Sequence, residues 1–309
     1  MLFLGIDSSN YRSSAAVLCD DLKYKSNRKL LNVAQGERGL RQSDAVFLHT
    51  KQLPYLIKDL LDATDVSKIS CIGVANCPRR QEGSYMPCFL TGLSYAEILS
   101  SALKVPLFKF SHQEGHIAAA LLSSGRLDLL DKEFIAFHVS GGTTEALLVS
   151  PSDVGFKVRI IAKTLDLHLG QVIDRVGVKL GLAFPCGEEL EKLALTGKVT
   201  KKVVPCIKGF DCALSGVENI CQKMIENGEN RENIAAYTIA FAAETLCKMT
   251  MNIKQKYTDL PIVYSGGVMA NNIIKKQLRE ITDADFASIE LSGDNAVGIA
   301  LMAKLNLEK

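Results

Sequence analysis

The sequence contains no apolar run that approaches the about 18 residues needed to cross a membrane. Residues 1–7 lack the basic start of a secretory signal peptide and soon turn polar. The nine cysteines form no CxxC pair and have no regular spacing, which is typical of reduced thiols in the cytosol. These absences predict a cytoplasmic protein without a membrane segment.

An excess of one kind of charge is also missing. Lysine and arginine number 36 against 34 aspartates and glutamates, so the net charge is only +2. A protein that binds nucleic acid on its own usually carries a clear basic surface. Any nucleic acid would therefore bind to a local patch or together with a partner protein. The length of 309 residues and the 47% hydrophobic content indicate a globular chain with more than one core.

Apolar runs bounded by polar turns predict an α/β protein. Residues 2–7 and 14–19 are expected to form one β-hairpin, and residues 134–139 and 146–149 a second one. This repetition suggests two copies of one α/β unit. Further strands are predicted at 69–75, 105–110 and 262–264, and helices at 43–62, 91–103, 171–182, 188–196, 231–255, 272–281 (capped by Asn271 or Asn272) and 294–305.

Two of the five histidines, His112 and His116, stand four residues apart. On a helix this spacing puts both imidazoles on one face, close enough to hold one metal ion. Two ordinary surface or core histidines are the alternative. Glu114 would lie about 200° around the helix from His112, so the general-base role of a zinc-protease HExxH motif is not expected. A third ligand is usually a carboxylate, and Asp294 is the candidate, although N-capping of the last helix competes for its oxygens.

Two Ser-Gly-Gly turns, at residues 140–144 and 264–268, each follow an apolar strand. Glycine lets backbone N–H groups approach a phosphate, although ordinary tight turns are the alternative. Neither turn matches a P-loop or a Rossmann fingerprint. Gln171, Asp174 and Arg175 share one predicted helix face, where Asp174 could accept a hydrogen bond from a ribose or belong to an ion-paired surface. The motifs together indicate a nucleotide-using metalloenzyme.

These motifs, in this order, resemble the TsaD family of tRNA threonylcarbamoyladenosine transferases, formerly called glycoprotease or peptidase family M22. That family belongs to the actin-like (ASKHA, ribonuclease H-like) superfamily. The resemblance rests on the HxEGH motif at 112–116, the Asp-Asn pair at 294–295, and the glycine turns at 140–142 and 266–271. It implies two actin-like α/β domains, 1–110 plus 295–309 and 111–294, around a central cleft for nucleotide and metal.

The resemblance also implies roles for individual residues. His112, His116 and Asp294 would bind the metal. Asp7 and Ser140 are candidate catalytic residues. Arg79 and Arg80 are further candidates, because they follow Pro78 at the end of a predicted strand and arginine offers a fork for carboxylate or phosphate. The nucleotide would be bound by Gly141, Gly142, Thr143, Gly170, Asp174, Gly187, Gly266, Gly267 and Asn271.

The activity implied is metal-dependent transfer of a threonylcarbamoyl group from threonylcarbamoyl-AMP to N6 of an adenosine in tRNA, and peptidase activity is not expected. The cofactors would be one divalent metal and an adenine nucleotide (ATP, AMP or the adenylate). Iron or zinc suits imidazole ligands better than magnesium. The partners implied are tRNA and a TsaB-like paralogue, an accessory ATPase or a second copy of the chain.

Several segments depart from the family pattern, among them two loops in the first third of the chain. The acidic first loop of the family is replaced by residues 10–13, Asn-Tyr-Arg-Ser, and its Gly-Pro-Gly loop by residues 77–87 with two arginines. Acidic groups are lost and arginines gained, which favours a divergent paralogue. The alternatives are therefore transfer of a carbamoyl-type group to another acceptor, or a non-catalytic scaffold in a tRNA-modifying complex.

Overall fold

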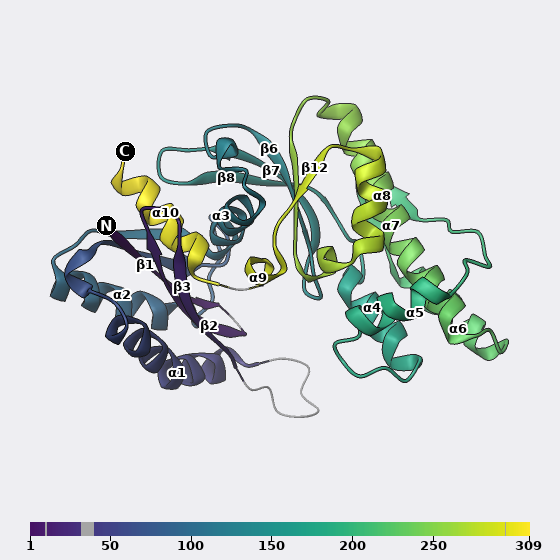
Figure 1. The fold of residues 1–309 in the computed structure, drawn as a ribbon, viewed down its shortest axis with the longest axis horizontal. Helices are drawn as coiled ribbons and strands as arrows, with labels where there is room; N and C mark the ends of the chain where they lie inside the picture. Colours follow the sequence, from purple (N-terminus) through teal and green to yellow (C-terminus); the bar gives the residue numbers. More distant parts are fainter. Residues whose placement is uncertain (10, 32–39, 294) are drawn as a thin grey trace. The chain divides into compact units, whose positions relative to one another are not determined.

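The structure, a computed structural model, describes residues 1–9, 11–31, 40–293 and 295–309. The chain divides into two compact units (Figure 1). Unit 1 comprises Met1–Leu130, Pro151–Lys157 and Glu290–Lys309, and unit 2 comprises Asp131–Ser150 and Val158–Ile289. Each unit is built on a five-stranded sheet. The strand orders, β3-β2-β1-β4-β5 and β8-β7-β6-β11-β12, are equivalent, so the two units repeat one α/β plan.

Unit 1 carries helices on both faces of its sheet. Apolar side chains of β1, β2 and β4 pack against α1 and α2 on one face, and α10 and α3 cover the other face. The strands are β1 (Leu2–Ser9), β2 (Arg12–Cys19), β3 (Tyr24–Leu30), β4 (Ile69–Cys77) and β5 (Leu107–Ser111). The helices are α1 (Gln42–Asp62), η1 (Val66–Lys68), α2 (Phe89–Leu103), α3 (His112–Ser124), η2 (Leu127–Leu129), α9 (Ile289–Ser292) and α10 (Val297–Leu307).

Helices α3 and α10 cross at two glycines. A Cβ on Gly298 would lie 1.9 Å from the carbonyl oxygen of Gly115, and a Cβ on Gly115 would lie 2.8 Å from Cδ1 of Ile299. Backbone atoms of α3 leave no room for a Cβ on Gly298, so only glycine allows this approach there, whereas a Cβ on Gly115 would meet the movable end of the Ile299 side chain. Gly298 therefore sets how closely α3, and with it the histidine pair, packs on α10.

A buried histidine makes the stability of unit 1 sensitive to acid. His49 on α1 is fully buried, and its Nδ1 lies 2.8 Å from Ser13 Oγ. Burial lowers the pKa of His49, so the folded chain binds this proton less readily than the unfolded chain. The contribution is complete above pH about 6.5 and is lost as the pH falls below that value. We expect urea unfolding at pH 7.5 and 5.5 to differ less in His49→Asn than in wild type. An equal pH dependence in both proteins would contradict this assignment.

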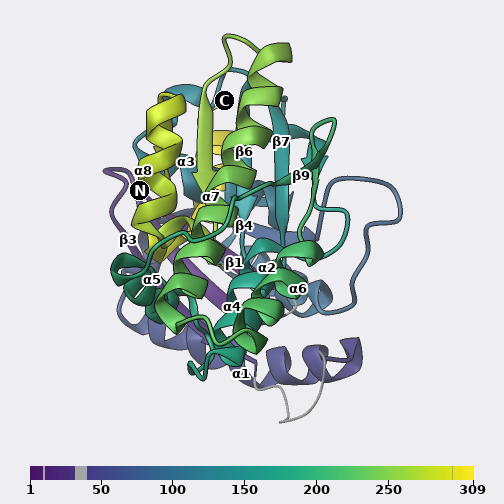
Figure 2. The ribbon, with the colours of Figure 1, turned by 90° about the vertical axis from the view of Figure 1, so that its right-hand side faces the viewer.

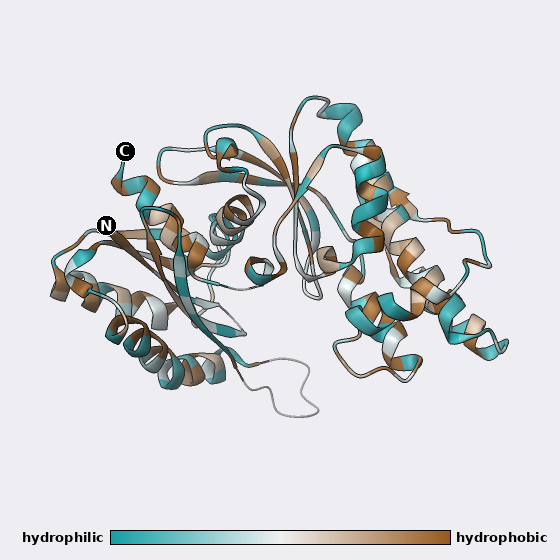
Figure 3. Cartoon of the chain, viewed as in Figure 1, coloured by the Kyte–Doolittle hydropathy of each residue, from teal (hydrophilic) through white to brown (hydrophobic). Residues whose placement is uncertain are grey.

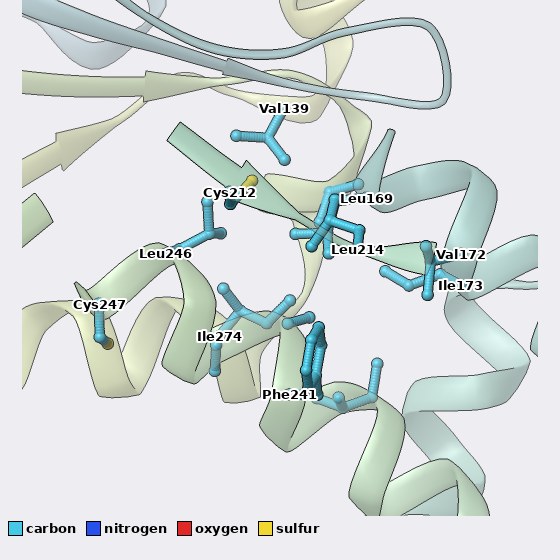
Figure 4. Packing of buried hydrophobic residues seen from close by; sticks show 14 of the residues in the cluster. Val139, Leu169, Val172, Ile173, Cys212, Leu214, Phe241, Leu246, Cys247 and Ile274 are labelled. Atoms are coloured by element: carbon cyan, nitrogen blue, oxygen red, sulfur yellow. The ribbon is translucent and has the colours of Figure 1, made fainter. Parts of the chain in front are cut away.

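Unit 2 places its main core between one sheet face and a layer of helices. Val139, Leu169, Phe241 and Ile274 come from four different elements and meet in this core with Leu214, the residue before α6 (Figure 4). The long helix α7 packs against α4, α5, α6 and α8 (Figure 2). The strands are β6 (Phe134–Val139), β7 (Thr144–Pro151), β8 (Phe156–Lys163), β9 (Cys206–Lys208), β10 (Asp211–Ala213), β11 (Ile262–Ser265) and β12 (Ala284–Phe286). The helices are α4 (Leu169–Lys179), α5 (Gly187–Thr196), α6 (Ser215–Glu226), α7 (Arg231–Lys256), η3 (Gly267–Ala270) and α8 (Asn272–Ile281).

The central strands of each sheet are apolar, whereas the outward faces of helices such as α8 are polar (Figure 3). Within the described residues, no helix is long and apolar enough to span a membrane. The hydropathy pattern is that expected for helices that bury one face against a sheet.

Most sequence-based elements are confirmed. Both hairpins and all seven predicted helices are present, although the last helix begins at Val297 rather than at residue 294. Strands β3, β8, β9, β10 and β12 and helices α3, α6 and α9 were not predicted as elements with bounds; β3, for instance, is a polar edge strand with no apolar alternation.

The division into units differs from the sequence-based domains 1–110 plus 295–309 and 111–294. Helix α3 belongs to unit 1, because it packs against α10 and follows directly from β5. Residues 151–157 also belong to unit 1. The histidine pair is therefore part of the first unit rather than the second.

Candidate metal and nucleotide sites

The start of α3 is held by a fully buried carboxylate, Glu114. Its Oε2 accepts hydrogen bonds from the backbone N and Oγ of Ser111, each at 2.7 Å, and from Arg80 Nε at 3.1 Å. Its Oε1 accepts from the backbone N of Phe156 at 3.1 Å. Ser111 Oγ in turn caps the helix by accepting from Glu114 N. Glu114 thus fixes the first turn of α3, and both of its carboxylate oxygens are engaged in these hydrogen bonds.

The histidine pair adjoins the carboxylate of Asp7. The rings of His112 and His116 lie 4.4 Å apart between centroids. Asp7 Oδ2 lies 2.6 Å from Nδ1 of His112, and Asp7 is 1% exposed. This contact occurs because β1, β4 and β5 are parallel, so their carboxyl ends meet at one edge of the sheet.

This arrangement fits a metal ion. A carboxylate on Nδ1 fixes the tautomer of His112 and directs Nε2 to a cation. Among the described residues, the other oxygen of Asp7, Oδ1, is buried and has no hydrogen-bond partner. An unpaired buried carboxylate oxygen is costly unless a cation compensates it. The structure thus places Asp7 beside the predicted ligands.

The predicted third ligand, Asp294, lies outside the described residues. The residues that the structure does describe contain no group of three His, Cys, Asp or Glu side chains that could hold a metal. Asn295 binds the backbone on both sides of the start of α10. Its Oδ1 accepts from Val297 N at 3.1 Å, and its Nδ2 donates to the carbonyls of Leu291 and Gly293.

The two predicted arginines differ in their contacts. Arg80 is bound to Glu114 and also donates to the carbonyl of Lys109 at 3.3 Å. This guanidinium therefore anchors the 77–87 loop to α3, which was not predicted. The backbone N of Arg79 donates to Ser84 Oγ at 3.1 Å, and a substrate role for its side chain stays a prediction.

In unit 2, the two glycine turns lie side by side. Strands β6 and β11 are parallel neighbours, and His138 pairs with Ser265. Both turns therefore follow the carboxyl end of their strand at the same sheet edge. Gly266 has φ +101°, and a Cβ there would lie 2.2 Å from the carbonyl oxygen of Val139. The spacing of the turns in the sequence, more than 120 residues, gives no hint of this contact.

The first turn is also joined to the start of α4. Ser140 Oγ accepts from the backbone N of Gly142 and Thr143, at 3.2 and 3.1 Å. The backbone N of Gly170 donates to the carbonyl of Ser140 at 3.2 Å. Ser140 therefore shapes the turn, and the amino-terminal end of α4, which favours anions, lies beside it.

The remaining nucleotide candidates lie on helices or at their amino-terminal ends. Asp174 Oδ1 accepts from the backbone N of Cys186 at 2.8 Å, next to Gly187, and burial raises the pKa of Asp174. Asn271 caps α8 through Ile274 N, as predicted. Arg175 pairs with Glu218, so it belongs to an ion-paired helix surface.

Comparison with known proteins identifies the family. A sequence profile described as TsaD, tRNA N6-adenosine threonylcarbamoyltransferase, matches residues 29–301. The chain belongs to this family. A tRNA N6-adenosine threonylcarbamoyltransferase of Thermosipho africanus is 29% identical over 97% of this chain and 93% of its own length. One from Enterococcus faecalis is 29% identical over 100% and 91%. A relative of Methanocaldococcus jannaschii, named probable bifunctional tRNA threonylcarbamoyladenosine biosynthesis protein, is 24% identical over 99% of this chain and 55% of its own length.

Solved structures support the actin-like fold of this TsaD family member. HypF of T. kodakarensis superposes with a TM-score of 0.60 at 15% identity, covering 99% of this chain and 48% of HypF. Component A of the (R)-2-hydroxyglutaryl-CoA dehydratase of Acidaminococcus fermentans gives 0.55 at 14% identity, covering 100% of both chains. At these identities the likeness shows the fold alone. The predicted fold class, two actin-like α/β units, is confirmed.

The glycine turns offer a test of nucleotide binding. A Cβ on Gly142 or Gly267 would meet no described atom within 4 Å, so alanine there should leave the fold intact. If backbone N–H groups of these turns hold a phosphate, Gly142→Ala and Gly267→Ala should weaken AMP binding about tenfold or more. Calorimetric titration with AMP and a thermal melt measure the two effects.

The matched control is Gly266→Ala. Gly266 has a positive φ, and an added Cβ there would collide with the backbone of Val139. This substitution should therefore lower the free energy of unfolding by at least about 1–2 kcal/mol, whether or not a nucleotide binds. A bulky residue at Gly266 is therefore a poor test of binding. Unchanged AMP affinity in both Gly142→Ala and Gly267→Ala would rule the turns out as a phosphate site.

A motif signal was overlooked at the start of α3. Ser111 and Glu114 stand three residues apart directly before an apolar helix, which is the sequence pattern of a capping box.

Asp166 plays a similar role at the start of α6, where it accepts from Ser215 N and Oγ at 3.1 and 2.6 Å. Partial burial opposes ionisation of Asp166, but these bonds outweigh it and lower its pKa to about 2.

Proposed function

We propose that this protein transfers a threonylcarbamoyl group from threonylcarbamoyl-AMP to N6 of an adenosine in tRNA. The observation that carries the proposal is the Asp7–His112–His116 cluster in a chain of the TsaD family. A scaffold protein would have no need to keep a buried carboxylate on the Nδ1 of one of two adjacent histidines. This arrangement supports an enzyme over the scaffold alternative.

His112, His116 and Asp294 would hold one divalent metal, and iron or zinc suits the two imidazoles. When bound, such a metal acts as a Lewis acid that polarises the carbamoyl carbonyl and orients the acyl group. Asp7 would keep His112 in the tautomer that presents Nε2, and Glu114 would hold α3 in place. The protein's own contribution at this end is therefore to orient the ligands.

The adenylate would bind to unit 2. Its phosphate would accept hydrogen bonds from backbone N–H groups of the 140–143 turn, of Gly267 and of the start of α4. Asp174 would accept a hydrogen bond from its ribose. The N6 amine of adenosine attacks the carbamoyl carbon and forms a C–N bond. The bond between this carbon and the phosphate oxygen breaks, AMP leaves with that oxygen, and the amine loses a proton. Ser140 shapes the turn and needs no role as nucleophile in this reaction.

We further propose that the chain works with other proteins in the cytoplasm. The relative from Methanocaldococcus jannaschii extends well beyond the part that this chain covers and is named bifunctional. A separate accessory protein could supply the second activity that the additional part of that relative contributes. A TsaB-like paralogue and an accessory ATPase are the candidates, together with tRNA.

The decisive experiment uses purified protein loaded with iron or zinc, threonylcarbamoyl-AMP, and unmodified tRNA. We expect AMP release that depends on tRNA, and threonylcarbamoyladenosine in the digested tRNA. His112→Ala should lack both. AMP release without modified tRNA would favour transfer to another acceptor, which the altered first loop also allows. No AMP release under any of these conditions, with the candidate partners added, would refute the proposal.

A further inference from the structure

A row of cations in unit 2 begins beside the first glycine turn. The backbone N of Thr164 donates to the carbonyl of Thr144, the last residue of that turn, at 2.9 Å. Lys163 directly precedes Thr164 at the end of β8, and Arg159 stands four residues earlier on the same strand, about 13 Å away. Both side chains are exposed, and β8 is the edge strand of its sheet.

The β9–β10 hairpin and the end of α7 continue this row. Thr164 and Cys212 form a parallel bridge, which brings the hairpin next to the end of β8. Asn252 Nδ2 donates to the carbonyl of Gly209 at 2.9 Å, which joins the hairpin turn to the last turns of α7. We refer to four exposed cations and two rings of these elements as the basic strip: Arg159, Lys163, Lys208, Lys256, Phe210 and Tyr257. All six residues belong to unit 2.

Neutral groups hold two of these cations in place. Lys256 Nζ lies 5.9 Å from the centroid of the Phe210 ring and 5.7 Å from that of the Tyr257 ring. Arg159 Nη2 donates to the hydroxyl oxygen of Tyr257 at 3.3 Å. Both rings are partly buried against the unit 2 core, so they are fixed supports. A ring attracts a cation through its quadrupole without neutralising it. The two charges are therefore positioned but not compensated.

Carboxylates do not neutralise the basic strip. Within the described part of the chain, no ion pair joins any of its four cations to a carboxylate. Lys192 of α5, by contrast, pairs with two glutamates of its own helix. The segments of the strip contain Asp211, whose Oδ1 accepts from the backbone N of Lys163 at 2.8 Å, and Asp259. Four cations against two carboxylates leave the strip with a net positive charge.

Two ordinary explanations account for single members of the basic strip. Charged side chains on an edge strand prevent sheets from pairing edge to edge, which suits Arg159 and Lys163. A lysine in the last turn of a helix interacts favourably with the helix dipole, which suits Lys256. Neither explains why cations of separate elements share the ring of Tyr257 and form a row that ends at the glycine turn. An anion with many phosphates along one strand explains both.

We propose that the basic strip binds the phosphate backbone of tRNA outside the target nucleotide. The proposal rests on the proposed transferase function and adds to it a docking surface for the acceptor. The net charge of the chain is only +2, so a local strip of this kind is what phosphate binding requires. Phosphate contacts carry no sequence information, so the strip orients the tRNA rather than selecting its sequence.

The test titrates labelled, unmodified tRNA with metal-loaded protein by fluorescence anisotropy, from about 50 to about 200 mM salt. The variant Arg159→Gln/Lys256→Gln should bind tRNA about tenfold or more weakly than wild type. The slope of log K against log salt should fall in magnitude by about 1.4–1.8, since two phosphate contacts contribute about 0.7–0.9 each. The KM for tRNA should rise by the same factor as the Kd, with melting temperature, metal content and AMP affinity unchanged.

Two further variants separate charge from structure. Arg159→Lys/Lys256→Arg keeps both charges and should retain the salt slope and most of the affinity. Lys198→Gln/Lys202→Gln removes two equally exposed lysines elsewhere in unit 2 and should change the affinity by less than about twofold. The backbone N of Lys198 donates to Asn233 in the first turn of α7, whereas Lys256 is in the last turn, about 35 Å along the helix.

Three results would overturn the proposal. The first is unchanged tRNA affinity and salt slope in Arg159→Gln/Lys256→Gln. The second is an equal loss in Lys198→Gln/Lys202→Gln, because tRNA would then bind through diffuse charge. The third is unchanged tRNA affinity together with lost binding to vesicles that contain anionic lipid, which would assign the strip to a membrane. Failure of the proposed function gives a different result: tRNA affinity depends on the strip as expected, but wild type releases no AMP and forms no threonylcarbamoyladenosine.

Discussion

Replacing Glu114 by alanine is expected to destabilise unit 1 by about 3–5 kcal/mol and to abolish metal binding. The carboxylate is fully buried, and four donors from Ser111, Arg80 and Phe156 converge on it. Removing one partner of a buried ionic network leaves the other groups buried without compensation. Because the donors come from β5, the 77–87 loop and β8, the loss should release the start of α3, which carries both histidines. Urea unfolding and metal analysis measure the two effects.

An exposed ion pair in the same unit serves as the control. Glu97 pairs with Lys109 at 2.9 Å, and both side chains are about half exposed. Glu97→Ala should cost less than about 1 kcal/mol and leave metal content unchanged. The role of Arg80 can be separated by a double-mutant cycle with Glu114. Additive effects of Arg80→Ala and Glu114→Ala would mean that the pair contributes nothing to holding α3.

The second large effect is expected at the histidine pair. His112→Ala should weaken iron or zinc binding by more than about a hundredfold, because the loss of even an outer hydrogen-bond partner costs about tenfold to a hundredfold. Asp7→Asn should weaken metal binding by only about tenfold to a hundredfold. This variant keeps the shape of the side chain but removes the negative charge that lies beside Nδ1 of His112. Metal analysis after dialysis, with zinc competition titrations, measures both.

The matched control is His168→Ala in unit 2, a variant that should retain the metal. Dialysis against a chelator should remove the metal from wild type and stop AMP release, and returning iron or zinc should restore it. Full metal retention in His112→Ala would refute the metal assignment. A loss in Asp7→Asn as large as that in His112→Ala would show instead that Asp7 is itself a ligand.

Local patterns were sufficient for the elements that carry the candidate residues. The hairpins, the glycine turns after apolar strands and the Asn271 cap all follow from side-chain period and turn chemistry within about ten residues. Edge strand β3 was missed for the same reason, because its polar residues carry no such period.

The extent of the first unit could not be read from local patterns. Gly115 and Gly298 are 183 residues apart in sequence, yet their contact holds α3 on α10 and so assigns the histidines to unit 1. A boundary placed at a loop after residue 110 overlooks this packing. The contact of Arg80 with Glu114 could not be read from local patterns either, since nothing in the loop itself indicates that Glu114 is its partner.

The sequence by itself determined which residues are chemically suited to binding a metal and a phosphate. These are two imidazoles at helical spacing and glycines after strands, and the sequence also determined the family in which they occur together. The tertiary structure decided which of them meet. The parallel order of β1, β4 and β5 brings Asp7 to His112, 105 residues away, and the parallel pairing of β6 with β11 joins the two glycine turns. Such contacts depend on strand order and register, which are set by the packing of the whole sheet rather than by any short stretch of sequence.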